Sequence, residues 1–61
     1  GANLRKSDLK GANLNGAKLR QADLRGCDLR ESDLAEADLR RAKLKGARLK
    51  KAKTNDAKGL S

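Results

Sequence analysis

The chain has no aromatic residue, no methionine, no histidine and no proline, and it contains a single cysteine among 61 residues. Aromatic side chains normally supply the largest buried areas, so their absence excludes an ordinary globular core. One cysteine without histidine excludes a disulfide framework and a zinc site with the usual protein ligands. No apolar run is long enough to span a membrane, and no signal peptide is visible.

Charge is abundant and unbalanced, because 16 Lys and Arg accompany 8 Asp and Glu for a net charge of +8. With 39% charged residues, such a composition is typical of a disordered basic segment. The order of the residues contradicts that interpretation, because a five-residue repeat fills the chain. The repeat places leucine at Leu4, Leu9, Leu14, Leu19, Leu24, Leu29, Leu34, Leu39, Leu44 and Leu49.

A period of five residues fits neither an α-helix nor an unbroken strand. On a helix, successive leucines would step by about 140° and would form no stripe. On a straight strand, an odd period would place alternate leucines on opposite faces. A small residue lies two positions before each leucine, which is strand spacing and puts both side chains on one side. Short extended pieces joined by turns keep both inward, which predicts a solenoid whose coils pair about 4.8 Å apart.

Three of the units, Ala12–Gly16, Ala22–Gly26 and Ala37–Arg41, read ANLNG, ADLRG and ADLRR. They resemble the A(D/N)LXX signature of pentapeptide-repeat proteins, and the resemblance covers residues 2–58. It implies an all-β fold, a right-handed quadrilateral parallel β-helix with about three coils of four pentapeptides each, in one domain over 1–61. The leucine and the small residue point inward in that family, so the expected core is the ten leucines together with Cys27.

The end of the chain departs from the repeat, because Thr54 and Gly59 occupy leucine positions and Leu60 is one place out of register. Residues 59–61 are therefore predicted to be a terminal tail. Three coils are near the minimum for a stacked array, and open coil edges invite pairing with another chain. We expect the domain to be a module of a larger protein, with further coils or a protein partner covering an end.

Stacking four units per coil, as the resemblance implies, aligns residues twenty apart and sorts the charges into rings. The expected rings are an acidic one of Asp23, Asp28, Asp33 and Asp38, and above it a basic one of Lys43, Arg48, Lys53 and Lys58. Opposite charges across paired strands contribute about 0.2–1 kcal/mol each. The sequence therefore predicts ion pairing between coils that helps to fix their register.

Residues that follow the leucines form basic stripes along the expected solenoid. This candidate surface for an anionic partner comprises Arg5, Arg25, Lys45, Lys10, Arg30, Lys50, Arg20 and Arg40. One interpretation is a solvated surface that maintains solubility. The other is a partner that neutralises the stacked like charges, which otherwise repel each other.

The sequence predicts no enzyme, no cofactor, no metal and no small-molecule substrate, because it lacks histidine, a phosphate-binding loop and an acidic pair within a cleft. The favoured function is a structural or protein-interaction scaffold with a rigid charged surface. The alternative is a sequence-independent binder of nucleic acid or another anionic surface, which the net charge favours and the missing aromatics weaken. The resemblance also implies DNA mimicry that protects gyrase in some members, but the charge of +8 conflicts with it. Among cell compartments, the sequence favours the cytoplasm.

Overall fold

The computed structural model describes residues 2–60, so Gly1 and Ser61 of the expected domain and tail lie outside the described residues. Within this range the backbone pairs through isolated parallel bridges between residues twenty apart. The bridges are Asn3–Asp23, Asp8–Asp28, Asn13–Asp33, Lys18–Asp38, Asp23–Lys43, Asp28–Arg48, Asp33–Lys53 and Asp38–Lys58. Residues 2–60 contain no helix long and apolar enough to cross a membrane.

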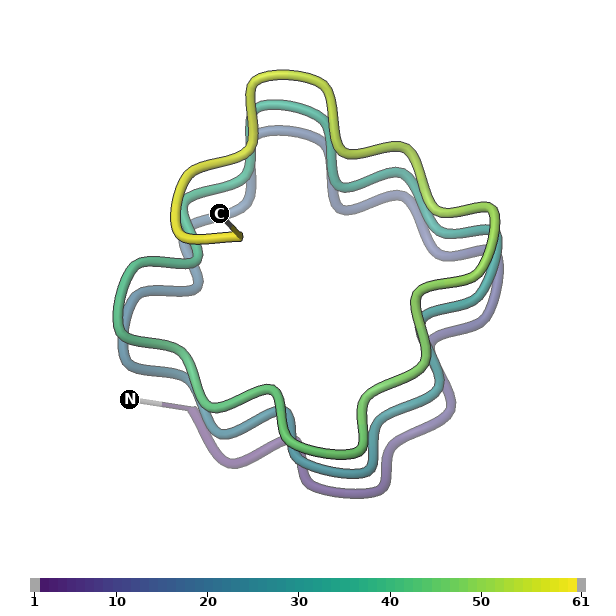
Figure 1. Cartoon of the computed structure of the whole chain (residues 1–61), viewed down its shortest axis with the longest axis vertical. Coiled ribbons are helices and arrows are strands. Elements are labelled where there is room, and N and C mark those ends of the chain that lie inside the picture. The colour runs from purple at the N-terminus through teal and green to yellow at the C-terminus, as the bar shows by residue number, and fades with distance from the viewer. Residues whose placement is uncertain (1, 61) are drawn as a thin grey trace.

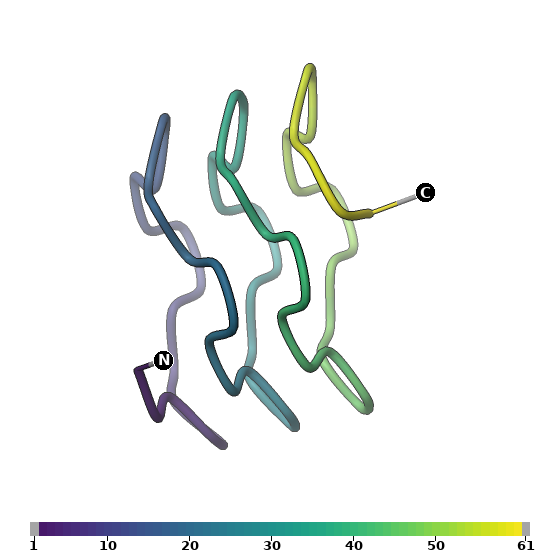
Figure 2. The same ribbon diagram turned by 90° about the vertical axis from the view of Figure 1, so that its left-hand side faces the viewer.

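Each bridge is framed by two backbone hydrogen bonds. The Asp23 N–H donates to the Ala2 carbonyl at 2.8 Å, and the Asp23 carbonyl accepts from the Leu4 N–H at 2.8 Å. On its other edge the middle segment repeats the pattern, with Lys43 N–H donating to the Ala22 carbonyl at 2.9 Å. Residues 22–41 therefore bond to both neighbours, and three layers stack as residues 2–21, 22–41 and 42–60 (Figure 2).

Between bridges the chain turns at the two residues that follow each leucine. The Ser7 N–H closes the first turn by donating to the Leu4 carbonyl at 3.1 Å. The second turn residue has a positive φ, 59° at Lys6 and 72° at Gly11, as in the third position of a type II turn. Because a turn follows every bridge, no extended piece grows beyond a single bridge residue in 2–60, and the chain has less strand than an all-β fold leads one to expect.

Four units occupy successive sides of the outline, and the turns form its lobes (Figure 1). We number the sides in chain order. Side 1 comprises 2–6, 22–26 and 42–46; side 2 comprises 7–11, 27–31 and 47–51; side 3 comprises 12–16, 32–36 and 52–56; side 4 comprises 17–21, 37–41 and 57–60. Sides 1 and 3 are thus opposite, whereas side 4 adjoins side 1.

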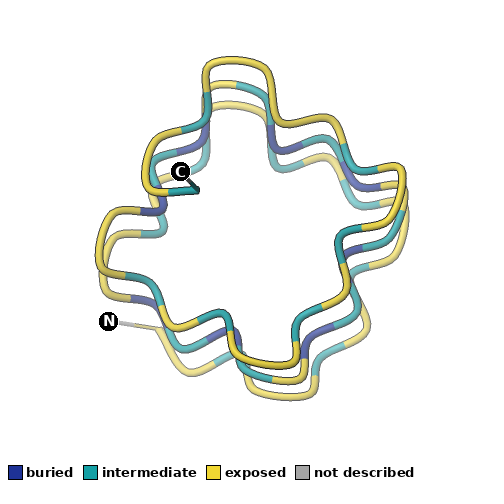
Figure 3. Ribbon diagram, in the orientation of Figure 1, coloured by how far each residue is buried: buried dark blue, intermediate teal, exposed yellow. Residues whose placement is uncertain are grey.

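Among residues 2–60, the fully buried core belongs to the middle layer (Figure 3). Its large side chains are Leu24, Leu29, Leu34, Leu39 and Cys27. The outer leucines are half-buried and pack against this cluster; they are Leu4, Leu9, Leu14, Leu19, Leu44 and Leu49. The buried Ser32 hydroxyl donates to the Leu29 carbonyl at 2.7 Å, and burial raises the pKa of the Cys27 thiol.

At the C-terminal end the chain leaves the repeat path at Gly59 and turns inward across the end of the solenoid (Figure 1). Gly59 has a φ of 92°, and a Cβ at this position would lie 2.6 Å from the carbonyl carbon and oxygen of Leu39. Only glycine permits this approach without displacement of the backbone. Leu60 is thereby brought, half-buried, against the core.

Candidate interaction surface

Where the residue before a leucine is Asn or Asp, it carries the bridge and also stabilises the turn that follows. In the first layer the Asn3 Oδ1 atom accepts a hydrogen bond from the Arg5 N–H at 3.2 Å. Asp33 does the same for the Ala35 N–H at 3.0 Å in the middle layer. This is the local bonding for which Asn and Asp are favoured in turns. The Asp or Asn of the repeat is therefore explained by a backbone N–H two residues later.

Three carboxylates of the middle layer also bind an arginine within the same unit. Arg25 donates from Nε to Asp23 Oδ1 at 2.8 Å and from Nη2 to Asp23 Oδ2 at 2.6 Å. Arg30 with Asp28 and Arg40 with Asp38 form the same two-pronged contact. Such forked pairs combine charge with fixed geometry. We call these three contacts the Asp–Arg forks.

The forks keep their carboxylates ionised. Hydrogen bonds from the Arg25 side chain are the main cause that lowers the pKa of Asp23 to about 2. Hydrogen bonds from Arg30 and Arg40 hold the pKa values of Asp28 and Asp38 well below their usual range. The same contacts raise the pKa values of the three arginines. Each fork is consequently an ionised pair over the whole neutral range.

The forks are direct contacts within a unit, whereas the rings that the sequence predicts attract between coils without direct contact. Besides the hydrogen bonds from Arg30, the charge of Arg48 in the next layer lowers the pKa of Asp28. Asp23 and Lys43 are bridged as the twenty-residue register requires. Each of the three ion pairs found within residues 2–60, however, joins two residues of the same pentapeptide. The reason is that each arginine occupies the first turn position, where its N–H already donates to the same carboxylate, so its side chain reaches both carboxylate oxygens. The sequence signal is the triplet Asp-Leu-Arg, which occurs at 23–25, 28–30 and 38–40.

The eight cations of the candidate surface do not form one patch. Arg5, Arg25 and Lys45 lie on side 1, Lys10, Arg30 and Lys50 on side 2, and Arg20 and Arg40 on side 4. Arg25, Arg30 and Arg40 are occupied in forks. The other five are exposed, and no ion pair among residues 2–60 includes them. The sequence prediction therefore gave equal weight to neutralised and unneutralised cations.

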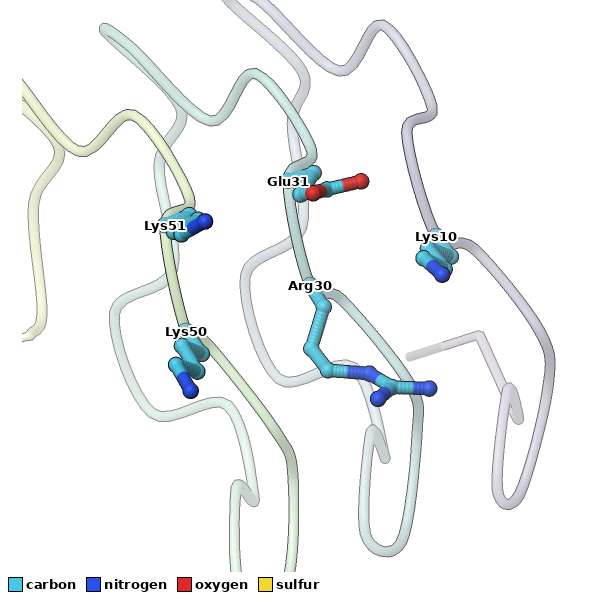
Figure 4. A pocket seen from close by; sticks show the side chains of 5 residues that line it. All are labelled: Lys10, Arg30, Glu31, Lys50 and Lys51. Carbon is cyan, nitrogen blue, oxygen red and sulfur yellow. The ribbon is translucent and has the colours of Figure 1, made fainter.

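On side 2 a shallow hollow of about 180 Å³ is lined by Lys10, Arg30, Glu31, Lys50 and Lys51 (Figure 4). Lys10, Arg30 and Lys50 come from successive layers, as Figure 4 shows. The hollow also holds the Glu31 carboxylate, and Arg30 is bound to Asp28. It is an open surface feature with mixed charge. Residues 2–60 hold no cluster of three side chains suited to a metal ion.

The four sides differ in net charge, and the basic stripes do not reveal this asymmetry. Sides 1 and 4 each carry five cations and one carboxylate, side 2 carries five cations and three carboxylates, and side 3 carries one cation and three carboxylates. Outside the forks, the cations of sides 1 and 4 are Arg5, Lys6, Lys43, Lys45, Lys18, Arg20, Arg41 and Lys58, all exposed. Five of these, Lys6, Lys43, Lys18, Arg41 and Lys58, lie at bridge or turn positions outside the predicted stripes. The sequence does indicate their place, because the twenty-residue register assigns each of these five residues to side 1 or side 4.

A family model described as pentapeptide repeats matches the chain in eight copies, over residues 1–26 and 17–53. Among curated proteins, none matches the chain.

Solved structures with the same architecture include three named pentapeptide-repeat proteins. The protein from the Arabidopsis thaliana thylakoid lumen is 39% identical over 97% of this chain and 41% of its own, with a TM-score of 0.92. Rfr23 from the cyanobacterium Cyanothece 51142 is 36% identical over 90% of this chain and 38% of its own, with a TM-score of 0.87. HetL from Nostoc sp. strain PCC 7120, involved in heterocyst differentiation regulation, is 26% identical over 90% of this chain and 37% of its own, with a TM-score of 0.55.

The chain thus spans about two fifths of the length of these relatives. Their likeness implies a right-handed quadrilateral β-helix, which agrees with the twenty-residue bridges and the four-lobed outline (Figure 1). The repeats matched in sequence and the architecture matched in structure agree, and the chain belongs to the pentapeptide-repeat family.

Proposed function

We propose that the chain forms three coils of four pentapeptides each and acts as a non-enzymatic scaffold that binds a protein partner through a rigid charged surface. The observation that carries this proposal is the ladder of parallel bridges between residues twenty apart. Layers about 4.8 Å apart hold the outward side chains on a fixed grid. A surface organised in this way is suited to recognition, because the backbone has little conformational freedom left to lose on binding.

The chemistry of the surface supports binding more than catalysis. The ionisable groups with the most altered pKa values are carboxylates already satisfied by arginine. A catalytic carboxylate is instead tuned toward the working pH and faces a cleft. The hollow on side 2 is open and is lined by long charged side chains. We therefore assign the forks a structural role.

The exposed cations make an acidic region the fitting partner. Further coils of a larger chain are a second kind of neighbour, since the solved relatives extend well beyond the length matched. DNA mimicry is disfavoured, because a mimic of duplex DNA needs negative charge and this chain carries +8.

A sequence-independent binder of nucleic acid or another anionic surface is the second candidate. The cations at corresponding positions of successive layers favour it, for example Arg5 below Arg25 and Lys45. Such binding would rest on phosphate contacts and would weaken steeply with salt.

Titration of the isotope-labelled protein with an acidic polypeptide, duplex DNA and single-stranded DNA tests the proposal. We expect amide shifts at outward positions with the acidic polypeptide and little change in the core. A lower dissociation constant for DNA than for the acidic polypeptide would favour the second candidate. If no polyanion binds at about 50 mM salt, where the Debye length exceeds 10 Å, the charged-scaffold proposal is wrong.

A further inference from the structure

The distribution of charge among the four sides identifies where a partner binds and what kind of chain it is. Sides 1 and 4 adjoin, and each has four exposed cations outside the forks. Side 3, opposite side 1, has three carboxylates and one cation. We propose that a flexible acidic polypeptide segment binds across the edge between sides 4 and 1. This inference rests on the proposed scaffold function and names its partner and its surface.

Sides 1 and 4 differ from the other two sides because their carboxylates are already neutralised by arginines of the protein itself. Arg25 and Arg40 are held by Asp23 and Asp38, so each side has no carboxylate left over. On side 2 the carboxylates of Asp8 and Glu31 remain among the cations. An incoming carboxylate on sides 4 and 1 consequently meets eight cations outside the ion pairs and no carboxylate outside the forks, whereas on side 2 it meets both signs.

The shape of the surface favours a flexible partner. Sides 4 and 1 face in different directions around a convex edge (Figure 1). Duplex DNA is straight over this distance, since its persistence length is about 50 nm, and it can lie against one side at a time. A disordered acidic segment can follow both sides and approach all eight cations.

The chemistry of the surface separates a polypeptide from single-stranded nucleic acid. Proteins that bind single strands combine a basic groove with aromatic side chains on which bases stack. This chain has no aromatic residue, so the bases would gain nothing beyond their phosphates. Carboxylates on a polypeptide need only charge and hydrogen-bond donors, which the exposed lysines and arginines supply. The acidic side 3 would repel the same segment and thereby restrict it to the edge between sides 4 and 1.

Two triple variants with equal net charge test this assignment. The first, Lys6→Gln with Arg20→Gln and Lys45→Gln, removes three cations from sides 1 and 4. The control, Lys51→Gln with Lys10→Gln and Lys50→Gln, removes three from side 2. Each set changes one residue with positive φ and two at the first turn position. Circular dichroism melts establish that both variants fold like the unmodified protein.

The probe is fluorescently labelled poly-L-glutamate of about twenty residues, titrated at about 50 mM salt and followed by anisotropy. We expect the first variant to raise the dissociation constant by about tenfold or more and the control by less than about threefold. A 20-base-pair duplex should bind the unmodified protein more weakly than the polypeptide.

Equal losses in the two variants would overturn the inference and leave the scaffold function standing, because attraction would then follow net charge alone. Tighter binding of the duplex would overturn the polypeptide as partner. No binding of any polyanion to the unmodified protein would overturn the proposed function itself. If a variant fails to fold, amide shifts of the unmodified protein with poly-L-glutamate decide instead: they should map to sides 4 and 1, and shifts spread over side 2 as strongly would contradict the assignment.

Discussion

At the scale of single residues, an Asn or Asp before a leucine does more than its polarity alone reveals. Its backbone forms the bridge, its side-chain oxygen accepts the N–H two residues later, and in the forks it also holds an arginine. The inward leucines followed from the period of five and the two-residue spacing to a small side chain. The forks did not, because the reach of an arginine to the carboxylate two residues earlier depends on the turn between them, which the spacing of the leucines does not define.

The forks make acid sensitivity the first prediction. The folded-state pKa of Asp23 is about 2, below the value near 4 of an unfolded aspartate. Its stabilising contribution is therefore complete above about pH 4 and is lost as the pH falls toward 2. Thermal unfolding midpoints measured from pH 7 to about pH 2 should decline in this window. In the triple variant D23N/D28N/D38N the decline should be smaller, and an identical decline would show that the forks do not cause it.

The bridge position of the third layer gives the second prediction. Lys53 occupies the place of Asn13 and Asp33, which accept N–H bonds from the residue two positions later. Lys53→Asn should supply that acceptor to the Asn55 N–H and raise the free energy of unfolding by about 0.5–1.5 kcal/mol. Urea denaturation measures the change. Lys53→Gln is the matched control, because its longer side chain does not fit this local contact, and equal gains from both would contradict the explanation.

At the scale of the pentapeptide, the element is a single bridge residue followed by a tight turn. The sequence indicated short extended pieces and turns, but not how short the pieces are. The turn requires a positive φ at its second residue, and seven residues other than glycine adopt it among 2–60. Each such residue costs about 1–2 kcal/mol relative to glycine in that region. Hydrogen bonds between layers and the buried leucines offset that strain, which is why the local sequence did not predict the turn geometry.

The close approach at Gly59 predicts that a side chain at this position destabilises the last turn. In Gly59→Ala the new Cβ would meet the Leu39 carbonyl at 2.6 Å and strain a φ of 92°. We expect the free energy of unfolding to fall by about 2–3 kcal/mol, or the last residues to leave the core. Gly11→Ala is the control, since its φ is 72° and its Cβ would meet nothing within 4 Å, so its loss should stay near 1 kcal/mol. Denaturant titration compares the two, and a Gly59 loss no larger than that of Gly11 would contradict the close approach.

At the scale of the whole molecule, stability and binding both depend on how the layers stack. The middle layer is bonded on both edges and holds the buried leucines, whereas the leucines of the outer layers are half-buried. The sequence predicted the columns that stacking creates once four units per coil were taken from the family. The net charge of each side follows from the same register when it is applied to the bridge and turn positions as well as to the residues after leucine.

Matched leucine substitutions in one column test the gradient of burial. Leu29→Ala in the middle layer should lower the free energy of unfolding by about 2–5 kcal/mol, because a buried side chain is removed and a cavity is left. Leu49→Ala, half-buried in the layer above, should cost about 1–2 kcal/mol. Chemical denaturation gives both values. Similar losses at the two positions would mean that the outer layer is packed as tightly as the middle one.

The register of twenty residues underlies the layers, the sides and the binding surface, and it is open to direct measurement. Through-hydrogen-bond scalar couplings in the isotope-labelled protein connect an amide nitrogen to the carbonyl carbon that accepts its proton. We predict couplings from the Asp23 amide to the Ala2 carbonyl and from the Lys43 amide to the Ala22 carbonyl, whose donor–acceptor distances are 2.8 and 2.9 Å. Couplings that connect these amides to carbonyls in a register shifted by one pentapeptide would contradict the account.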